Sequence, residues 1–345
     1  MPMTSASEDS VHGAPEGHAK LVRTISREGG VAVRSIIGSN LIAEAMNRRK
    51  MAPTAANALG RALMGCVLIA VGPASADPVE ATGANPSNND SNDSNERDEK
   101  DDNNEKDDKG QAGESVQLQF RGDGPLGNMV VISDDLGRVR GIVEHPETNL
   151  TLADGSPDVA RAIGLGALRV VRHRPQWREP YTGAVPLVSG EIAKDITLYL
   201  TESEQTPSAM GLGVAMANDE SAVVAAGFLV QILPDAAPEE VAQVEENVRL
   251  LPSLSQLALS NTHCDEMLDL LLRGLGSRLR HTTYPVFHCT CTRARALRMM
   301  ALLGKQELRE MIARELNQEV RCEFCAKAYD FTTLEIRTML DEARD

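Results

Sequence analysis

The sequence predicts an α+β fold in three parts: an N-terminal mixed α/β sheet domain, a helical linker and a small C-terminal domain. Three observations predict it. Short β-like runs alternate with turn signals over residues 20–234, two amphipathic helical stripes follow in residues 235–285, and four of the six cysteines gather between residues 289 and 325. A chain of 345 residues, 42% of them apolar, is long enough for two domains with sizeable cores.

The N-terminal domain is predicted to begin with two strands and two helices. Residues 1–19 contain no apolar run and are expected to be a disordered leader rather than a targeting segment. Residues 21–37 form two β-like runs around a Glu-Gly-Gly turn, and helices are predicted over 41–49 and from about residue 54 onward. The second helix enters the apolar stretch 62–71, which is too short to span a bilayer, so we expect a buried core helix and no membrane partner.

An acidic insertion interrupts this domain. Residues 73–115 carry 13 acidic and 4 basic side chains, a net charge of −9 within a whole-chain charge of −15, and the stretch 85–110 has almost no apolar side chains. Such a segment cannot bury enough surface to offset the entropy of ordering it. The insertion is therefore predicted to be disordered.

The rest of the N-terminal domain is predicted to be mainly β. Turn residues separate β-like runs at 115–122, 128–135, 138–145, 166–174, 210–219 and 221–234, and the first three runs should form a meander. Between the fourth and fifth runs, Ser189 can cap a helix with one apolar face, formed by Ile192, Ile196, Tyr199 and Leu200.

Two helices are predicted in the linker, residues 235–285. One apolar stripe, which includes Val244 and Val248, ends before Pro252, and a second stripe begins near residue 262. Helices this short are marginal in water unless they pack on a neighbour. The linker is therefore predicted to be metastable.

Residues 286–345 contain the most informative pattern. Cys289 and Cys291 form a C-x-C pair, and Cys322 and Cys325 form a C-x-x-C pair about 30 residues later. Two helical runs between the pairs would bring them together, and four thiolates make the tetrahedral set that zinc prefers in closed sites. The spacing predicts a C-terminal zinc-binding domain with one zinc per chain, held by these four cysteines.

Other interpretations of the cysteines stay open at this point. A purely structural zinc ribbon without a redox role would use the same four residues, and iron–sulfur ligation or a thioredoxin-like motif is a weaker alternative. Cys66 is predicted to be an inert thiol in the core helix, whereas Cys264 lies in the first turn of a helix, where a secondary reactive role is open. His288, beside Cys289, is expected to lie outside the ligand set.

The remaining patterns argue against an enzyme and against a nucleic-acid partner. An overall charge of −15 opposes binding to a polyanion, which requires Lys and Arg to displace counterions. No pair of nucleophile and base is evident in the sequence. Gly211-Leu212-Gly213 lacks the third glycine of a dinucleotide site, and Gly304-Lys305 lacks the upstream glycine of a phosphate loop.

Several segments together resemble the heat shock protein 33 family of redox-regulated chaperones. The cysteine pairs stand in CTCTRARALRMMALLGKQELREMI and CEFCAKAYDF, and the other matching segments are RTISREGGVAVR, APTAANALGRAL, LQFRGDGPLG and GFLVQILPDA. The resemblance runs over residues 20–71 and 115–340. The acidic insertion and Cys264 depart from the family pattern.

The resemblance implies a switch for oxidative stress. Oxidation by peroxide or hypochlorous acid would join Cys289 to Cys291 and Cys322 to Cys325, release the zinc and unfold the linker, and the chain would then bind unfolding client proteins without ATP. The resemblance also implies a homodimer in the oxidised state. We expect the protein to act in the cytoplasm or in an organelle matrix. The rival interpretations are a zinc-ribbon nucleic-acid-binding protein and a thiol oxidoreductase.

Free energies favour such a switch independently of the resemblance. Structural zinc supplies about 10–16 kcal/mol to the folding of small domains, whereas whole domains are stable by only about 5–15 kcal/mol. Loss of zinc should unfold the C-terminal domain and so remove one of two expected supports of the linker, the other being the sheet domain. Four arginines near the cysteines in sequence are expected to offset the thiolate charge: Arg293, Arg295, Arg298 and Arg321.

Overall fold

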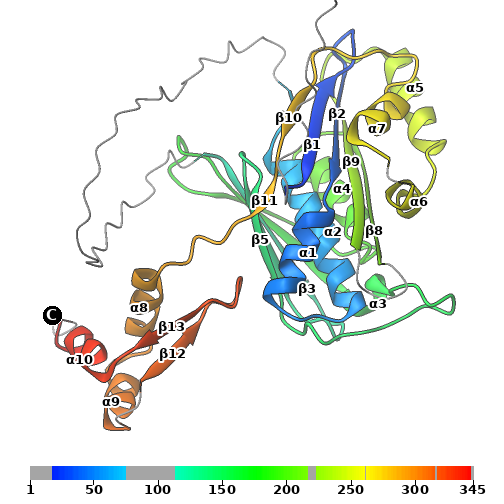
Figure 1. Cartoon of the computed structure of the whole chain (residues 1–345). Helices are drawn as coiled ribbons and strands as arrows, with labels where there is room; N and C mark the ends of the chain where they lie inside the picture. The colour runs from blue at the N-terminus through cyan, green and yellow to red at the C-terminus, as the bar shows by residue number, and fades with distance from the viewer. Residues whose placement is uncertain (1–17, 75–112, 217–222, 261, 315–316, 343–345) are drawn as a thin grey trace, which may run out of the picture.

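Two β-sheets with a helix buried between them form the body of the protein, and a smaller C-terminal lobe lies beside it (Figure 1). The computed structural model describes residues 18–74, 113–216, 223–260, 262–314 and 317–342. The mixed α and β content and the separate cysteine-bearing lobe confirm the predicted α+β fold class.

The five-stranded sheet joins segments from distant parts of the chain in the order β10-β1-β2-β9-β8. Its strands are β1 (Lys20–Ile25), β2 (Val31–Ile37), β8 (Ser208–Met216), β9 (Val223–Ile232) and β10 (His281–Thr283), and all neighbouring pairs are antiparallel. The hairpin of β1 and β2 is the predicted one, and Gly29 in its turn has a φ of 101°, which a side chain would disfavour.

The six-stranded sheet has the order β11-β5-β4-β3-β6-β7. Its strands are β3 (Ser115–Gly122), β4 (Met129–Asp134), β5 (Arg138–Val143), β6 (Gly166–His173), β7 (Tyr181–Pro186) and β11 (Val286–Phe287). The predicted meander of β3, β4 and β5 is confirmed. The sequence predicts no strand at β7, because this mostly exposed edge strand lacks an apolar alternation.

Helix α2 (Pro53–Ala70) is the one helix of the described residues that is long and apolar enough to cross a membrane by length and composition. The apolar stretch 62–71 covers only the second half of this 18-residue helix. The sequence argument that the stretch is too short to span a bilayer is therefore wrong, because the whole helix is long enough. However, 89% of the helix is buried inside the protein, with Pro53 and Arg61 as the exceptions. The predicted buried core helix is therefore confirmed.

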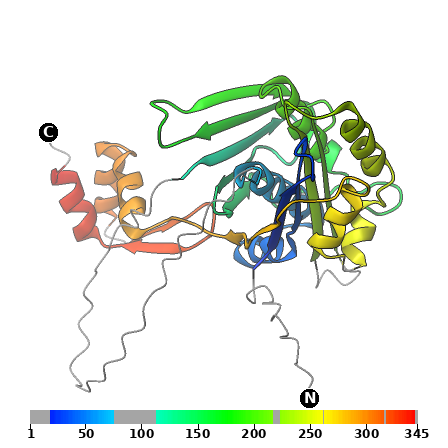
Figure 2. The ribbon, with the colours of Figure 1, turned by 90° about the horizontal axis from the view of Figure 1, so that it is seen from above.

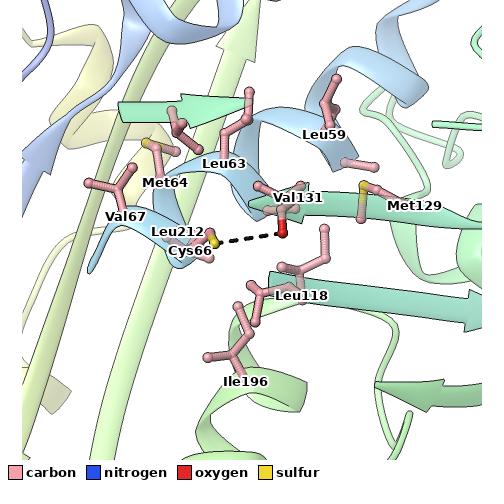
Figure 3. Close-up of a cluster of buried hydrophobic side chains, with 14 of the residues drawn as sticks. Leu59, Leu63, Met64, Cys66, Val67, Leu118, Met129, Val131, Ile196 and Leu212 are labelled. Carbon is pink, nitrogen blue, oxygen red and sulfur yellow. Dashed lines mark hydrogen bonds between the residues drawn. The ribbon is translucent and has the colours of Figure 1, made fainter. Parts of the chain in front are cut away.

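Side chains of α2 contact both sheets. The Asn57 amide donates a hydrogen bond to the Val214 carbonyl of the five-stranded sheet, over 2.9 Å. On the other side, the Cys66 thiol donates to the carbonyls of Val116 at 3.3 Å and Val131 at 3.8 Å. Figure 3 shows this thiol among the apolar side chains of both layers, and its burial raises the pKa of Cys66 to about 12. The predicted inert core thiol is thus in place.

Three shorter helices complete the body. α1 (Ser39–Arg48) packs on α2 and β9, α3 (Val159–Ile163) on α2 and β3, and α4 (Ala193–Glu202) on β7 and β8. The apolar face predicted for α4 is buried, but Ser189 is not its cap. The Asp195 carboxylate instead accepts hydrogen bonds from the backbone N–H groups of Val188, Ser189 and Ile192 and from the Ser189 hydroxyl.

Three predicted segments fall wholly or largely outside the described residues. They are residues 1–17 of the leader, residues 75–112 of the acidic insertion, and the turn at 218–220 between β8 and β9. The described ends of the leader and the insertion belong to the body, since Ala19 and Ala74 are buried.

Arginine side chains of the body fix the chain just before and just after the insertion. Arg23 and Arg34 donate hydrogen bonds to carbonyl groups at the C-terminal end of α2, where positive charge is favourable. Burial lowers the pKa of Arg34 to about 9. Just before β3, Glu114 forms ion pairs with Arg172 and Arg174, each over 3.0 Å.

Three helices of the predicted linker cover the face of the five-stranded sheet that points away from α2. They are α5 (Pro238–Arg249), α6 (Leu254–Leu259) and α7 (Cys264–Leu271), of which α6 is too short to show a helical period in the sequence. Residues alternate along β1 and β2, so that one set packs on α2 and the other on these helices. The second set forms one buried cluster with Val244, Met267, Leu268 and Leu271: Val22, Val31 and Val33.

Residues 281–287 connect α7 to the cysteines as edge strands of both sheets. β10 pairs with β1, and β11 pairs in parallel with β5. The backbone N–H of Val286, in β11, donates to the Gly137 carbonyl over 3.1 Å, and that of His288, just after β11, donates to the Val139 carbonyl over 2.8 Å. The sequence predicts neither strand, because runs of three and two residues carry no periodic signal.

The C-terminal lobe contains α8 (Arg293–Ala301), α9 (Lys305–Ala313), β12 (Gln318–Arg321), β13 (Ala328–Phe331) and α10 (Thr333–Glu342). The two helices predicted between the cysteine pairs are confirmed, and α10 is an additional element. The buried apolar residues of the lobe are few: Met300, Leu308, Tyr329, Phe331, Ile336 and Met339. Figures 1 and 2 show that the lobe and helices α5–α7 lie at opposite ends of the body.

Candidate metal centre

Two short turns carry the four cysteines of the lobe. Cys289 and Cys291 follow β11 directly and precede α8, whose first turn is capped by the Thr292 hydroxyl. Cys322 and Cys325 lie in the turn between β12 and β13, which is closed by backbone hydrogen bonds from Cys322 N–H to Lys327 and from the N–H of residue 326 to Cys322. Each turn therefore presents two thiols toward the other turn.

The four sulfur atoms have the spacing of a metal site. All four lie within 4.8 Å of one another. The distance from Cys289 Sγ to Cys322 Sγ is 3.6 Å, and that from Cys291 Sγ to Cys325 Sγ is 3.3 Å. Zn–S bonds of about 2.3 Å in a tetrahedron require sulfur atoms about 3.8 Å apart. The four predicted residues are thus brought together in an arrangement that could hold a metal ion.

Hydrogen bonding makes the thiols unequal. Burial raises the pKa of Cys289 and of Cys325. Burial also acts to raise the pKa of Cys291, but the Tyr329 hydroxyl and the surrounding thiols outweigh it and lower that pKa to about 7. Tyr329 donates to both the thiol and the carbonyl of Cys291, at 3.2 and 3.0 Å. Of these three thiols, Cys291 is therefore the first to become a nucleophile as the pH rises.

Arginines surround a cavity of about 650 Å³ beside the thiols. Arg295, Arg298 and Arg321 line it, as three of the four arginines expected near the cysteines. Arg293 points elsewhere, since its guanidinium pairs with Glu335 and lies 4.4 Å from the ring centre of Phe331. The fourth arginine of the cavity is Arg140, from β5 of the body.

The body and the metal-binding turns are in direct contact. The Arg140 guanidinium donates to the Thr290 hydroxyl over 3.1 Å and lies 5.2 Å from the ring centre of Phe324. Arg49 of the body donates to the Glu323 carbonyl over 3.4 Å. The sequence alone does not predict a role for Arg140, Arg49 or Tyr329, because their contacts join residues dozens to hundreds of positions apart and no local motif marks them.

The remaining candidates lie outside the centre. Cys264 is the first residue of α7 and is fully buried. Burial raises its pKa to about 11, which is opposite to the effect expected from its place in the first turn of a helix. Its thiol donates to the Lys20 carbonyl over 3.2 Å. His288 is not part of the metal-binding group, which consists of the four cysteines among the described residues.

Comparison with known proteins shows that the chain is similar to members of one family. The family model described as "Hsp33 protein" matches residues 108–332. The 33 kDa chaperonin of Geobacter sulfurreducens is 34% identical over 93% of this chain and 94% of the relative, and that of a strain of Thermus thermophilus is 35% identical over 94% and 87%. The crystal structure of the 33 kDa chaperonin of Thermotoga maritima, a heat shock protein 33 homolog, superimposes with a TM-score of 0.77 at 30% identity, covering 94% of this chain and 98% of that one.

Proposed function

This chain belongs to the Hsp33 family of chaperones, and from that premise we propose that it is a redox-regulated, ATP-independent holdase. Its relatives carry the names of chaperonins rather than of enzymes. The observation that carries the proposal is the group of four thiols at metal-binding distances, placed directly after a strand that is hydrogen-bonded to the body.

The proposed ligand of these thiols in the reduced protein is one zinc ion per chain. Four sulfur donors on two tight turns suit the tetrahedral preference of zinc. Oxidation would form disulfides between Cys289 and Cys291 and between Cys322 and Cys325, and would release the ion. Because all four sulfur atoms lie within 4.8 Å of one another, proximity alone does not select this pairing over the alternatives.

Loss of zinc is expected to unfold the lobe. Its core has few buried apolar side chains, and its interior contacts alone supply little of the free energy of folding. Structural zinc contributes about 10–16 kcal/mol, which matches or exceeds the about 5–15 kcal/mol by which whole domains are stable. We therefore assign residues 286–345 as the redox-switch domain.

The signal would reach the linker, residues 235–285, through β11 and β10. The sequence suggested that the zinc domain packs directly on the linker helices. In the described residues it does not, since helices α5–α7 rest on the five-stranded sheet at the far end of the body from the lobe. The chain between the cysteines and these helices is instead fastened by edge-strand hydrogen bonds. When the lobe unfolds, β11 and β10 would lose their anchor, and the chain that follows α7 would come free of the sheet edge. The short helices α6 and α7 would then be held only by their packing on the sheet face.

The surface released in this way suits unfolding client proteins. The linker helices and the sheet face beneath them share one apolar cluster, so their separation exposes both sides. We propose further that the clients are aggregating proteins, that the oxidised chain forms a homodimer, and that the protein acts under oxidative stress in the cytoplasm or in an organelle matrix.

Zinc content and client aggregation, measured on the same samples, test the proposal. The reduced protein should bind one zinc and leave a heat-denatured client to aggregate, whereas the peroxide-treated protein should contain no zinc and suppress aggregation. Hydrogen exchange should show loss of protection in residues 235–342, which include β10 and β11, and little change in the other strands of the two sheets. Suppression by the zinc-loaded reduced form, or catalytic turnover of a small disulfide, would refute it.

A further inference from the structure

The cavity beside the thiols has the features of a ligand site. Its volume of about 650 Å³ lies within the usual range for small-molecule pockets. Three of the four metal-binding cysteines reach its wall, namely Cys289, Cys291 and Cys322. Met299 and Phe324 add apolar and aromatic surface to the same wall. A peroxide molecule needs no cavity of this size, so the cavity fits a larger thiol-reactive molecule.

The charged residues that line the cavity indicate the charge of its ligand. Four arginines line the cavity, and among the described residues Arg140, Arg295 and Arg298 have no carboxylate partner. Arg321 pairs with Glu319, and Glu323 is the single carboxylate of the lining. A zinc ion with four thiolates would have a charge of about −2, which repels anions. The unpaired arginines remove that repulsion and supply donors for carboxylate groups.

The arginines are held toward the thiols by local contacts. The Arg140 guanidinium donates to the Thr290 hydroxyl over 3.1 Å, and the Arg295 guanidinium donates to the Thr290 carbonyl over 2.6 Å. Thr290 is the residue between the two cysteines of the C-x-C pair. An anion bound to these guanidinium groups therefore lies next to Cys289 and Cys291.

We propose that this cavity binds small anionic disulfides and presents their sulfur atoms to the cysteine thiolates. This inference rests on the proposed redox function and specifies its oxidant. A cysteine thiolate attacks one sulfur of the bound disulfide, the S–S bond breaks, a mixed disulfide forms and one small thiolate leaves. A second cysteine thiolate then attacks the mixed disulfide at the protein sulfur, and the second small thiolate leaves. Two electrons pass from two protein thiolates to the disulfide, and a zinc ion held by the four cysteines would thereby lose two of its ligands.

Two aromatic disulfides that differ in charge test this proposal. Dithiobisnitrobenzoate carries a carboxylate on each ring, whereas dithiodipyridine is uncharged at neutral pH. Absorbance of the released thiol and of a zinc indicator gives both rates with the full-length reduced protein. Arg298→Gln should slow the dianionic reagent about fivefold at low salt, the factor expected from one unit charge acting on a dianion across about 7 Å of solvent. The rate with dithiodipyridine should stay within about 1.5-fold, because an uncharged reagent feels little of this field.

Matched variants separate a binding role from a structural one. Arg298→Lys keeps the charge and should restore the rate with the dianion. Arg309→Gln makes the same charge change on the exposed side of α9, outside the cavity, and should leave both rates unchanged. Salt should reduce the difference between the two reagents in the wild-type protein. An equal effect of Arg298→Gln on both reagents, or no effect on either, would overturn the proposal.

This experiment is independent of the chaperone assay. If the oxidised protein failed to suppress aggregation, the proposed function would fall while the ratio of the two rates still reported on the cavity. If aggregation were suppressed but the rates showed no charge dependence, the cavity proposal alone would fall.

Discussion

Replacement of Phe287 by alanine should release the linker while zinc is still bound. Phe287 is the last residue of β11, and only 8% of it is exposed. The Arg48 guanidinium lies 5.2 Å from its ring centre. This side chain and the two flanking backbone hydrogen bonds, from Val286 and His288, attach the strand to the body. Removal of the ring therefore acts on the connection through which the lobe is proposed to control the linker.

The expected size of the effect follows from the burial of the ring. Replacement of a buried Phe by Ala costs about 3–5 kcal/mol. If β11 opens locally, a loss of about 3 kcal/mol raises the population of the open strand about a hundredfold. The amides of Val286 and His288 should then exchange about a hundredfold faster in the reduced protein. Cys264, the buried first residue of α7, should become reactive toward a thiol label if the opening reaches the helices.

Hydrogen exchange by mass spectrometry on the reduced, zinc-loaded variant measures this effect. Phe120→Ala, which removes a ring of 1% exposure from the centre of the body, controls for a general loss of stability. If Phe287→Ala lowered global stability as much as the control did and left residues 281–288 protected, the strand would not be the connection, and the reasoning would fail.

Three further predictions concern the metal centre and the insertion. Chelation of zinc should abolish the hydrogen-exchange protection of the lobe and leave α2 protected. The Cys66→Ala variant should still bind one zinc per chain by metal analysis, since this thiol lies in the core of the body. Loss of zinc in that variant would contradict the four-cysteine site. Deletion of residues 75–112 should change the free energy of unfolding by less than about 1 kcal/mol in a denaturant titration, because closure entropy varies slowly with loop length; a deletion variant that does not fold would refute the assignment.

Local patterns predicted the parts of this fold whose residues alternate or repeat over many positions. The alternation along β3, β4 and β5 predicted the meander, and the apolar residues that recur from residue 54 onward predicted the helix α2. The four cysteines were found from spacing alone, because each pair lies within one turn.

The remainder depends on contacts that local sequence does not record. β10 and β11 are too short for a period, and their strand partners lie far away along the chain. In the sequence, Arg140 is one of the polar residues that alternate along a predicted strand. Its place beside Thr290 follows only from the fold of the whole chain. The cap assigned to Ser189 failed because a serine can donate as well as accept, and the Asp195 carboxylate is the stronger acceptor.

The two closed ends of the acidic insertion have a practical consequence. Arg23 and Arg34 terminate α2 before the insertion begins, and the ion pairs of Glu114 fix the start of β3 after it ends. A second protein domain, such as a fluorescent protein, can be inserted between α2 and β3 without disturbing the strands of either sheet. With a second fluorophore fused after α10, energy transfer between the two would follow the departure of the lobe inside living cells. The chain would then become its own sensor for oxidants.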